Sequence, residues 1–206
     1  LTKLRPESIE DLTAALALYR PGPMESVPEY INNKNNPDNI KYDCEQLRSI
    51  LEVTYGCIVY QEQVMEIFRK LAGYSYGEAD IVRRAMAKKK HDVMEKERKR
   101  FIYGSDEPDS ECHGATGIGI PEKTASKIFD RMSAFASYAF NKSHAAAYAY
   151  LAYQTAYLRC HYFKEYMASV MTGCMDKNNG KLMNYMNECR AEGVRIIAPS
   201  VNRSSM

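Results

Sequence analysis

The strongest constraint on the fold is an uninterrupted stretch, rich in alanine and tyrosine, between residues 140 and 161. Five alanines follow Ser143 within ten residues, and neither glycine nor proline interrupts the stretch. Alanine has the highest helix propensity, and serine is a preferred N-cap residue. We therefore expect a long helix that is capped by Ser143 and ends near His161.

The start of this expected helix has the properties of an anion site. The free N–H groups and the positive dipole end of a helix attract anions, phosphate above all. Lys142 adds a positive charge, His144 adds a second donor, and Tyr148 lies one turn further along the same face. Such a corner suits a nucleotide, with its phosphates outside and its base or sugar on the ring. The alternative is that Ser143 only caps the helix and Tyr148 only packs.

A second aromatic stripe on the same helix is expected to serve the core. Tyr150, Tyr153 and Tyr157 fall on a different face from His144 and Tyr148. Tyrosines at helical spacing usually pack inside a domain. The alternative is a stacking platform for single-stranded nucleic acid.

A basic stretch is the other candidate for phosphate binding. Residues 83–100 hold nine Lys and Arg against three acids, in a chain whose net charge is only +2. On a helix, Arg84 and Lys88 lie four residues apart with Arg83 one step around, and guanidinium groups suit phosphate oxygens. The alternative is a solvated helix face, and the acids Glu95 and Glu97 favour that interpretation for residues 96–100 at the end of the stretch.

Four motifs resemble the bacterial replicative DNA polymerase III alpha subunit, the C-family DNA polymerase, and they occur in that family's order. They are YRPGPM (residues 19–24), YQEQVM (60–65), ADIVRRAMAKKK (79–90) and FNKSHAAAY (140–148), the last followed by YQTAYLR (153–159). Together they cover nearly the whole chain. The resemblance implies the fingers region of that enzyme, cut out of a much longer polypeptide.

The resemblance also implies roles for individual residues. The incoming deoxynucleoside triphosphate would be bound by Arg83, Arg84, Lys88, Lys142, Ser143, His144 and Tyr148. The DNA would be contacted by Arg20, Lys89, Lys90 and Arg159. One rival hypothesis is a non-catalytic helical module that binds nucleic acid through residues 83–100. Another is a structural fragment without a ligand of its own.

Catalytic residues are not expected in this chain. Polymerase chemistry needs paired carboxylates that hold two Mg²⁺ ions, and the sequence has no Asp-x-Asp pair. In the family these aspartates belong to the palm, which precedes the fingers. We therefore expect no cofactor or metal here, Mg²⁺ only in the complete enzyme, and no activity of this chain alone. Its expected partners are primer-template DNA, the rest of the alpha subunit and the accessory subunits of the replicase.

Composition narrows the protein class. The chain is 45% hydrophobic and 26% charged, without a run of 18 apolar residues and without an apolar signal core at its start. Its six cysteines show neither a C-x-x-C pair nor zinc-site spacing. These features predict a cytoplasmic protein with reduced cysteines and no membrane partner.

The expected fold class is mainly α, a multi-helix fingers domain around one core with little or no β-structure. Capping signals start helices after Ser8, at Ser75 and at Pro121, and Gly73 ends one that begins at Glu62. Only two short apolar runs, residues 57–60 and 194–197, resemble strands.

The expected domain organisation has three parts. Residues 1–24 would connect from the absent palm, residues 25–175 would form the fingers, and residues 176–206 would hold the last helix and the truncated start of the next domain. Phe163 stands where the family usually has proline, so the long helix is expected to continue without a kink toward Met171.

Overall fold

The computed structural model describes residues 1–88, 91–105, 110–174, 179–198 and 200–202. Contacts within the chain divide it into two compact units, Leu1–Tyr150 and Leu151–Met206. Each unit is described by itself, although one long helix, α9, contributes residues to both. The predicted boundaries at residues 24 and 175 stay a prediction.

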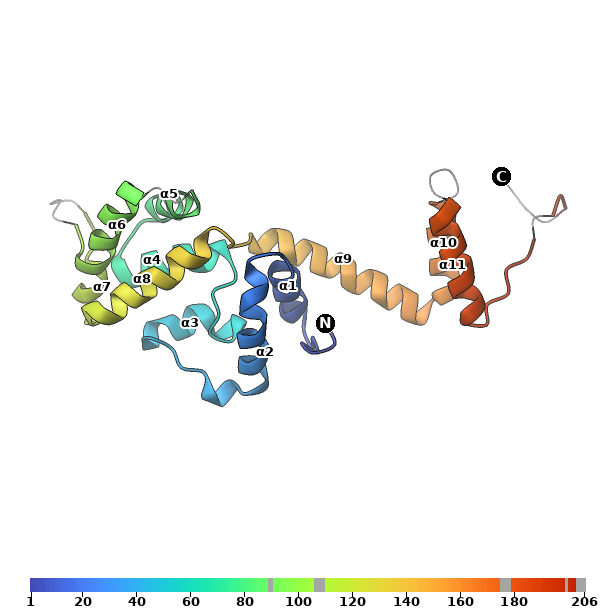
Figure 1. Ribbon diagram of the computed structural model, residues 1–206, viewed down its shortest axis with the longest axis horizontal. Helices are drawn as coiled ribbons and strands as arrows, with labels where there is room; N and C mark the ends of the chain where they lie inside the picture. The colour runs from blue at the N-terminus through green and yellow to red at the C-terminus, as the bar shows by residue number, and fades with distance from the viewer. Residues whose placement is uncertain (89–90, 106–109, 175–178, 199, 203–206) are drawn as a thin grey trace. The chain divides into compact units, whose positions relative to one another are not determined.

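The first unit opens with short helices (Figure 1). They are α1 (Ile9–Leu18), η1 (Pro23–Ser26), α2 (Val27–Asn35), η2 (Pro37–Asn39), η3 (Glu45–Leu47), α3 (Arg48–Leu51) and η4 (Glu52–Thr54). The predicted cap of α1 is confirmed, because the Ser8 side chain accepts a hydrogen bond from the Asp11 N–H. Ala14, Ala17 and Leu18 of α1 are buried, whereas Leu16 and the C-cap residue Tyr19 are exposed.

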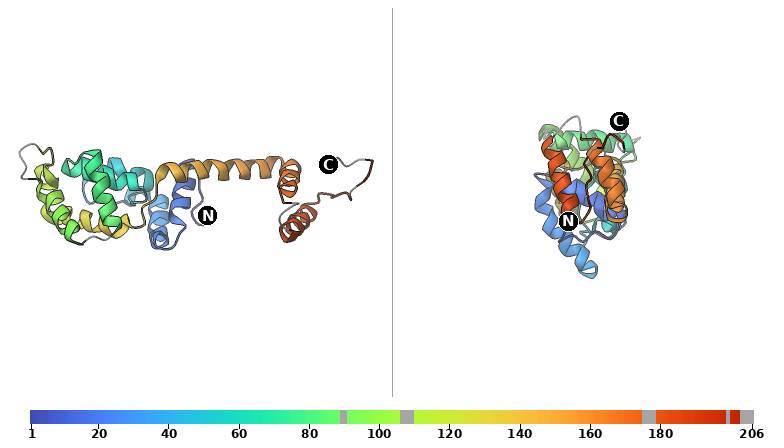
Figure 2. Two further views of the ribbon diagram at one scale, coloured as in Figure 1. Left: turned by 90° about the horizontal axis from the view of Figure 1, so that it is seen from above. Right: turned by 90° about the vertical axis from the view of Figure 1, so that its right-hand side faces the viewer.

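Longer helices follow, together with the short helix α7, and form the larger part of this unit. They are α4 (Gln61–Ala72), α5 (Tyr76–Ala87), α6 (His91–Tyr103), α7 (Gly114–Gly117) and α8 (Glu122–Ala136). Gly73 ends α4 in the left-handed conformation, and Ser75 with Glu78 forms the capping box of α5, as the sequence predicts. Figures 1 and 2 show these helices grouped together, and α4 contacts α5, α6, α7 and α8.

Three phenylalanines mark the centre of this helix group. Phe68 of α4, Phe101 of α6 and Phe129 of α8 are all fully buried, with ring centroids 5.3 to 6.2 Å apart. Burying one such side chain contributes about 1.5–3 kcal/mol relative to leaving it exposed. The three rings therefore hold α4, α6 and α8 in fixed relation to one another.

The predicted single core is divided into two clusters of buried residues. One is the group around the three phenylalanines, and the other joins α1, α2 and the start of α9. The extended residues 57–60 contribute to both, because Ile58 faces the first cluster while Cys57 and Val59 face the second. This alternation is typical of extended backbone.

The two runs that resemble strands do not form a sheet within the described residues. Tyr60 makes only an isolated parallel bridge with Phe140, and residues 194–197 are irregular. A strand needs a neighbouring strand that satisfies its backbone hydrogen bonds, and neither run lies beside an extended segment long enough to do so. The mainly α fold class is confirmed.

The second unit contains the end of α9 and two further helices. Helix α9 spans Lys142–His161, and α10 (Phe163–Thr172) contacts α11 (Asn179–Ala191). The prediction of an unkinked helix beyond residue 161 is wrong, because Tyr162 has φ −135° and ψ 49° and separates α9 from α10. Among the described residues no helix has the length and apolar character needed to span a membrane.

Candidate functional site

Helix α9 begins two residues earlier than an N-cap at Ser143 requires. Its first residue is Lys142, and the His144 N–H donates to Asn141 Oδ1 at 2.8 Å. This hydrogen bond makes Asn141 the N-cap and leaves Ser143 in the first turn. The predicted cap was therefore wrong, although asparagine and serine are equally good caps by residue type alone.

A carboxylate of the protein already lies at the positive end of α9. The Lys142 N–H donates to Oε1 and Oε2 of Glu62 at 3.2 and 3.1 Å, and Asn141 Nδ2 donates to Oε1 at 2.9 Å. A negative charge is stabilised at a helix N-terminus. The anion that the sequence predicts at this corner is thus supplied by Glu62, and a phosphate group would have to displace it.

The backbone before α9 is joined to the start of α4. The Gln61 N–H donates to Phe140 O at 2.9 Å, and the Phe140 N–H donates to Val59 O at 3.2 Å. Gln61 Nε2 also donates to Ala139 O at 3.0 Å. The two segments are 78 residues or more apart in the chain, so these bonds fix where α9 starts relative to α4.

The side chain of Gln63 secures the same junction from inside. Its Oε1 accepts from the Val59 and Tyr60 N–H groups at 2.8 and 3.0 Å, and its Nε2 donates to Thr54 Oγ1 at 2.7 Å. Gln63 is buried, and both ends of its amide have partners. Gln63 therefore fixes the backbone at the entry to α4.

Lys142 is engaged within the first unit. Its Nζ lies 3.1 Å from Glu10 Oε2 of α1 and 5.5 Å from the centre of the Tyr60 ring. Helix α1 lies beside the start of α9 in Figures 1 and 2. Any anion that recruits Lys142 must therefore compete with Glu10.

A row of rings leads away from this corner along α9. The centroids of Phe140 and His144 lie 5.5 Å apart, and those of His144 and Tyr148 lie 4.8 Å apart. Tyr148 is 55% exposed, so one side of this row is free for a flat ligand.

The other aromatic stripe of α9 does not pack into a core. Tyr150, Tyr153 and Tyr157 are 57%, 50% and 45% exposed, whereas Ala145 and Ala149 are buried. The prediction that the tyrosines serve the core was wrong. The small alanines let the backbone of α9 approach the second cluster, and the bulky rings lie outside that contact.

The arginines of α5 share one acidic partner. Asp80 Oδ1 accepts from Arg83 Nη2 at 2.6 Å and Nε at 3.0 Å, while Asp80 Oδ2 lies 2.7 Å from Arg84 Nη2. Hydrogen bonding from Arg83 lowers the pKa of Asp80, so this carboxyl stays ionised. The Arg83 side chain is only 13% exposed, but that of Arg84 is 68% exposed. Lys88, at the end of α5, is exposed and has no ion-pair partner among the described residues.

Both arginines in the rest of the basic stretch are also paired. Arg100 pairs with Glu78, and Arg98 pairs with Asp130 and donates to Ser126 Oγ at 2.7 Å. These contacts join α6 to α5 and α8. The solvated or structural interpretation therefore fits the end of the stretch better than phosphate binding does.

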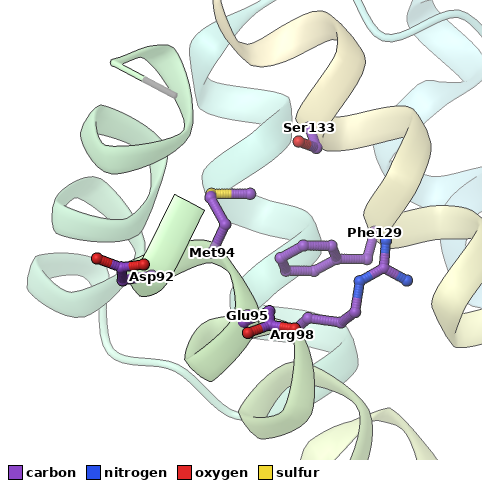
Figure 3. A pocket seen from close by; sticks show the side chains of 6 residues that line it. All are labelled: Asp92, Met94, Glu95, Arg98, Phe129 and Ser133. Atoms are coloured by element: carbon purple, nitrogen blue, oxygen red, sulfur yellow. The ribbon is translucent and has the colours of Figure 1, made fainter. Parts of the chain in front are cut away.

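A shallow pocket of about 300 Å³ lies between α6 and α8 (Figure 3). It is lined by Asp92, Met94, Glu95, Arg98, Phe129 and Ser133. The Arg98 guanidinium stands 5.1 Å from the centre of the Phe129 ring and is committed to Asp130. Two carboxylates in the lining would repel phosphate, so this pocket does not suit a triphosphate.

Two of the residues predicted to contact DNA have internal partners. Arg20 Nη2 donates to Tyr138 O at 2.8 Å, and its guanidinium lies 4.3 Å from the centre of the Phe140 ring. Gly22 follows with φ 97°, and a Cβ there would lie 2.5 Å from the Tyr138 ring, so only glycine fits this turn.

Arg159 pairs with Glu188 within the second unit. Lys89 and Lys90 lie outside the described residues.

The predicted nucleotide-binding residues form two groups within the first unit. Lys142, Ser143, His144 and Tyr148 lie on two turns of α9, while Arg83, Arg84 and Lys88 lie on and after α5. No hydrogen bond, ion pair or ring contact joins the two groups in the described part of the chain. Glu62 and Asn141 were missed by sequence reasoning, although asparagine is itself a preferred cap residue.

Comparison with known proteins identifies the family. A family model described as the bacterial DNA polymerase III alpha subunit finger domain matches residues 1–109. The chain belongs to this family. It is 45% identical over 206 residues to the DNA polymerase III subunit alpha of Thermus aquaticus, 46% over 204 residues to that of Borreliella burgdorferi, and 43% over 205 residues to that of Bacillus subtilis.

These relatives are much longer than the chain. The matches cover 98%, 99% and 100% of this chain but only 16–17% of the relatives. The finger-domain match ends before α8 and α9, whereas the matches to the relatives extend through both helices.

The carboxylates of the residues that the structure describes do not form a metal centre. Mg²⁺ prefers several oxygen ligands, usually carboxylates with waters. Among the described residues no group of three or more His, Cys, Asp or Glu side chains is arranged to hold a metal ion. That catalytic aspartates belong to another part of the polymerase stays a prediction.

Proposed function

We propose that this chain is the fingers module of a bacterial replicative DNA-directed DNA polymerase. It would bind the incoming deoxynucleoside triphosphate and contact the templating DNA, while parts of the subunit outside this chain transfer the nucleotide with the help of Mg²⁺. The observation that carries this proposal is the 43–46% identity to DNA polymerase III alpha subunits along the whole chain. Primer-template DNA, the rest of that subunit and the replicase accessory subunits would be its partners in the cytoplasm.

Two exposed features support nucleotide binding in particular. The Arg84 guanidinium and the Lys88 ammonium point outward from the end of α5, where they can neutralise phosphate charge. The exposed His144 and Tyr148 rings contact each other at a tilt of 52° and offer ring faces on which a base or sugar can rest. Arg83 would act mainly by holding Asp80, which in turn orients Arg84.

The test is Arg84→Ala in the full-length polymerase subunit. Losing one charge-assisted phosphate contact costs about 1.5–3 kcal/mol, so kcat/KM for the nucleotide should fall about ten- to a hundredfold. Primer-template affinity should change much less. Steady-state incorporation kinetics and a DNA-binding titration at one fixed salt concentration give both quantities.

Arg48→Ala is a matched control. Arg48 is also an exposed arginine in an ion pair within one helical turn, with Glu45 of η3, and it lies outside the proposed site. Its loss should leave the nucleotide KM unchanged. A fall in DNA affinity without any change in nucleotide kinetics for Arg84→Ala would instead favour the nucleic-acid-binding module.

A further inference from the structure

Glu62 joins the start of α4 to the first residues of α9. Its carboxylate accepts three hydrogen bonds, two from the Lys142 N–H and one from Asn141 Nδ2, at 2.9 to 3.2 Å. Each of these donors belongs to the N-cap or the first residue of α9. Glu62 therefore contacts the helix start itself, where a small shift changes the direction of every following side chain.

The other end of this contact is firmly fixed. Glu62 is the second residue of α4, and the next residues of that helix, Gln63 and Val64, are buried. The parallel bridge between Tyr60 and Phe140 holds the backbone on either side. A side chain anchored in this way can position the start of α9 within the first unit.

The rings that follow depend on this position. His144 is the third residue of α9, its N–H is capped by Asn141, and its ring contacts that of Tyr148. Asn141 thus links the Glu62 carboxylate to the turn that carries His144. Displacing reacting groups by about 1 Å can cost a hundredfold in rate.

We propose that Glu62 is a positioning residue for nucleotide binding, which acts through Asn141 and the first turn of α9 to orient His144 and Tyr148. This inference rests on the proposed function. Glu62 itself carries the same charge sign as a triphosphate and does not contact the nucleotide. Its role is to hold the helix start as the acceptor of hydrogen bonds from Asn141 Nδ2 and the Lys142 N–H.

Because Asn141 donates and Glu62 accepts, the donor and the acceptor can be exchanged between the two positions in the full-length subunit. Asn141→Asp keeps the acceptor for the His144 N–H but places a second carboxylate against Glu62. Asn141→Asp combined with Glu62→Gln restores one donor and one acceptor in reversed order, since the Gln amide can donate to Asp and still accept from the Lys142 N–H. Nucleotide KM, kcat, primer-template affinity and melting temperature are measured for each variant.

We expect Asn141→Asp to lower kcat/KM for the nucleotide about ten- to a hundredfold, mainly through KM. The double variant should recover to within about threefold of the parent. If Asn141→Asp does not fold, Asn141→Ser replaces it as the test variant, because serine still caps the helix but cannot reach Glu62. It should raise the nucleotide KM severalfold with little change in melting temperature.

Two controls make the outcomes distinct. Glu66→Gln alters a carboxylate one turn further along α4 that contacts Arg69 and Tyr76, and it should leave the nucleotide KM unchanged. Tyr148→Ala in the same assay reports whether α9 contributes to nucleotide binding at all.

A changed KM for Tyr148→Ala with no change for Asn141→Asp or Asn141→Ser would overturn the role of Glu62 and leave the proposed function intact. Failure of the double variant to recover would also overturn it. If Tyr148→Ala and Arg84→Ala both left nucleotide kinetics unaltered, the proposed function itself would be wrong.

Discussion

At the scale of single residues, burial decides which aromatic side chains stabilise this protein. Tyr150 is 57% exposed, whereas Phe129 is fully buried and contacts the rings of Phe68 and Phe101. Both are aromatic residues on long helices, and only the contact with other buried groups separates them.

Tyr150→Ala should therefore leave the free energy of unfolding within about 0.5 kcal/mol of the parent, because alanine is the better helix former and little buried area is lost. Phe129→Ala should cost about 3–5 kcal/mol, since it leaves a cavity among packed rings. Chemical denaturation of the two variants measures both values. A comparable loss in the two variants would mean that Tyr150 is buried in the functional protein.

At the scale of elements, ion pairs connect helices that are distant in the chain. Glu78 closes the capping box of α5 and also pairs with Arg100 of α6. Hydrogen bonds from Ser75 and then Arg100 lower the pKa of Glu78 to about 2. This carboxylate therefore joins a helix cap to an interhelical contact.

Glu78 should make the stability of this protein depend on pH in the acid range. A carboxyl whose pKa is lower in the folded state contributes fully above its unfolded value of about 4.3, and the contribution is lost as the pH falls toward 2. The melting temperature of Glu78→Gln should accordingly be below that of the parent at pH 6, and the gap should narrow between pH 5 and pH 3. A gap that stays constant over this interval would contradict the assignment.

At the scale of the whole molecule, the chain holds a candidate substrate surface without a metal centre in its described residues. It spans about a sixth of its longer relatives, which are DNA polymerase III alpha subunits. Nucleotide transfer by two metal ions needs carboxylates that the sequence does not supply as a pair.

The purified 206-residue chain should therefore extend no primer when it is given primer-template DNA, Mg²⁺ and all four nucleotides. The full-length subunit, assayed alongside, should extend the same primer. Template-directed extension by the short chain, in a preparation free of other polymerases, would show that the catalytic groups lie within it.

The sequence by itself determined the features that depend on neighbours within one or two turns. The caps at Ser8 and Ser75, the end of α4 at Gly73 and the mainly α class all follow from local propensity and short-range hydrogen bonds. The motifs that resemble the polymerase family belong to the same level, because they can be recognised without any knowledge of packing.

Only the tertiary structure decided how the candidate site is arranged. Asn141 rather than Ser143 caps α9 because the distant carboxylate of Glu62 and the bridge to Tyr60 fix the backbone there. Apolar side chains occur all around α9, so periodicity could not identify its buried face, and contact with the second cluster selected Ala145 and Ala149. Ion pairs and helix contacts between residues far apart in the chain leave no local pattern, and for that reason the site had to be seen in three dimensions.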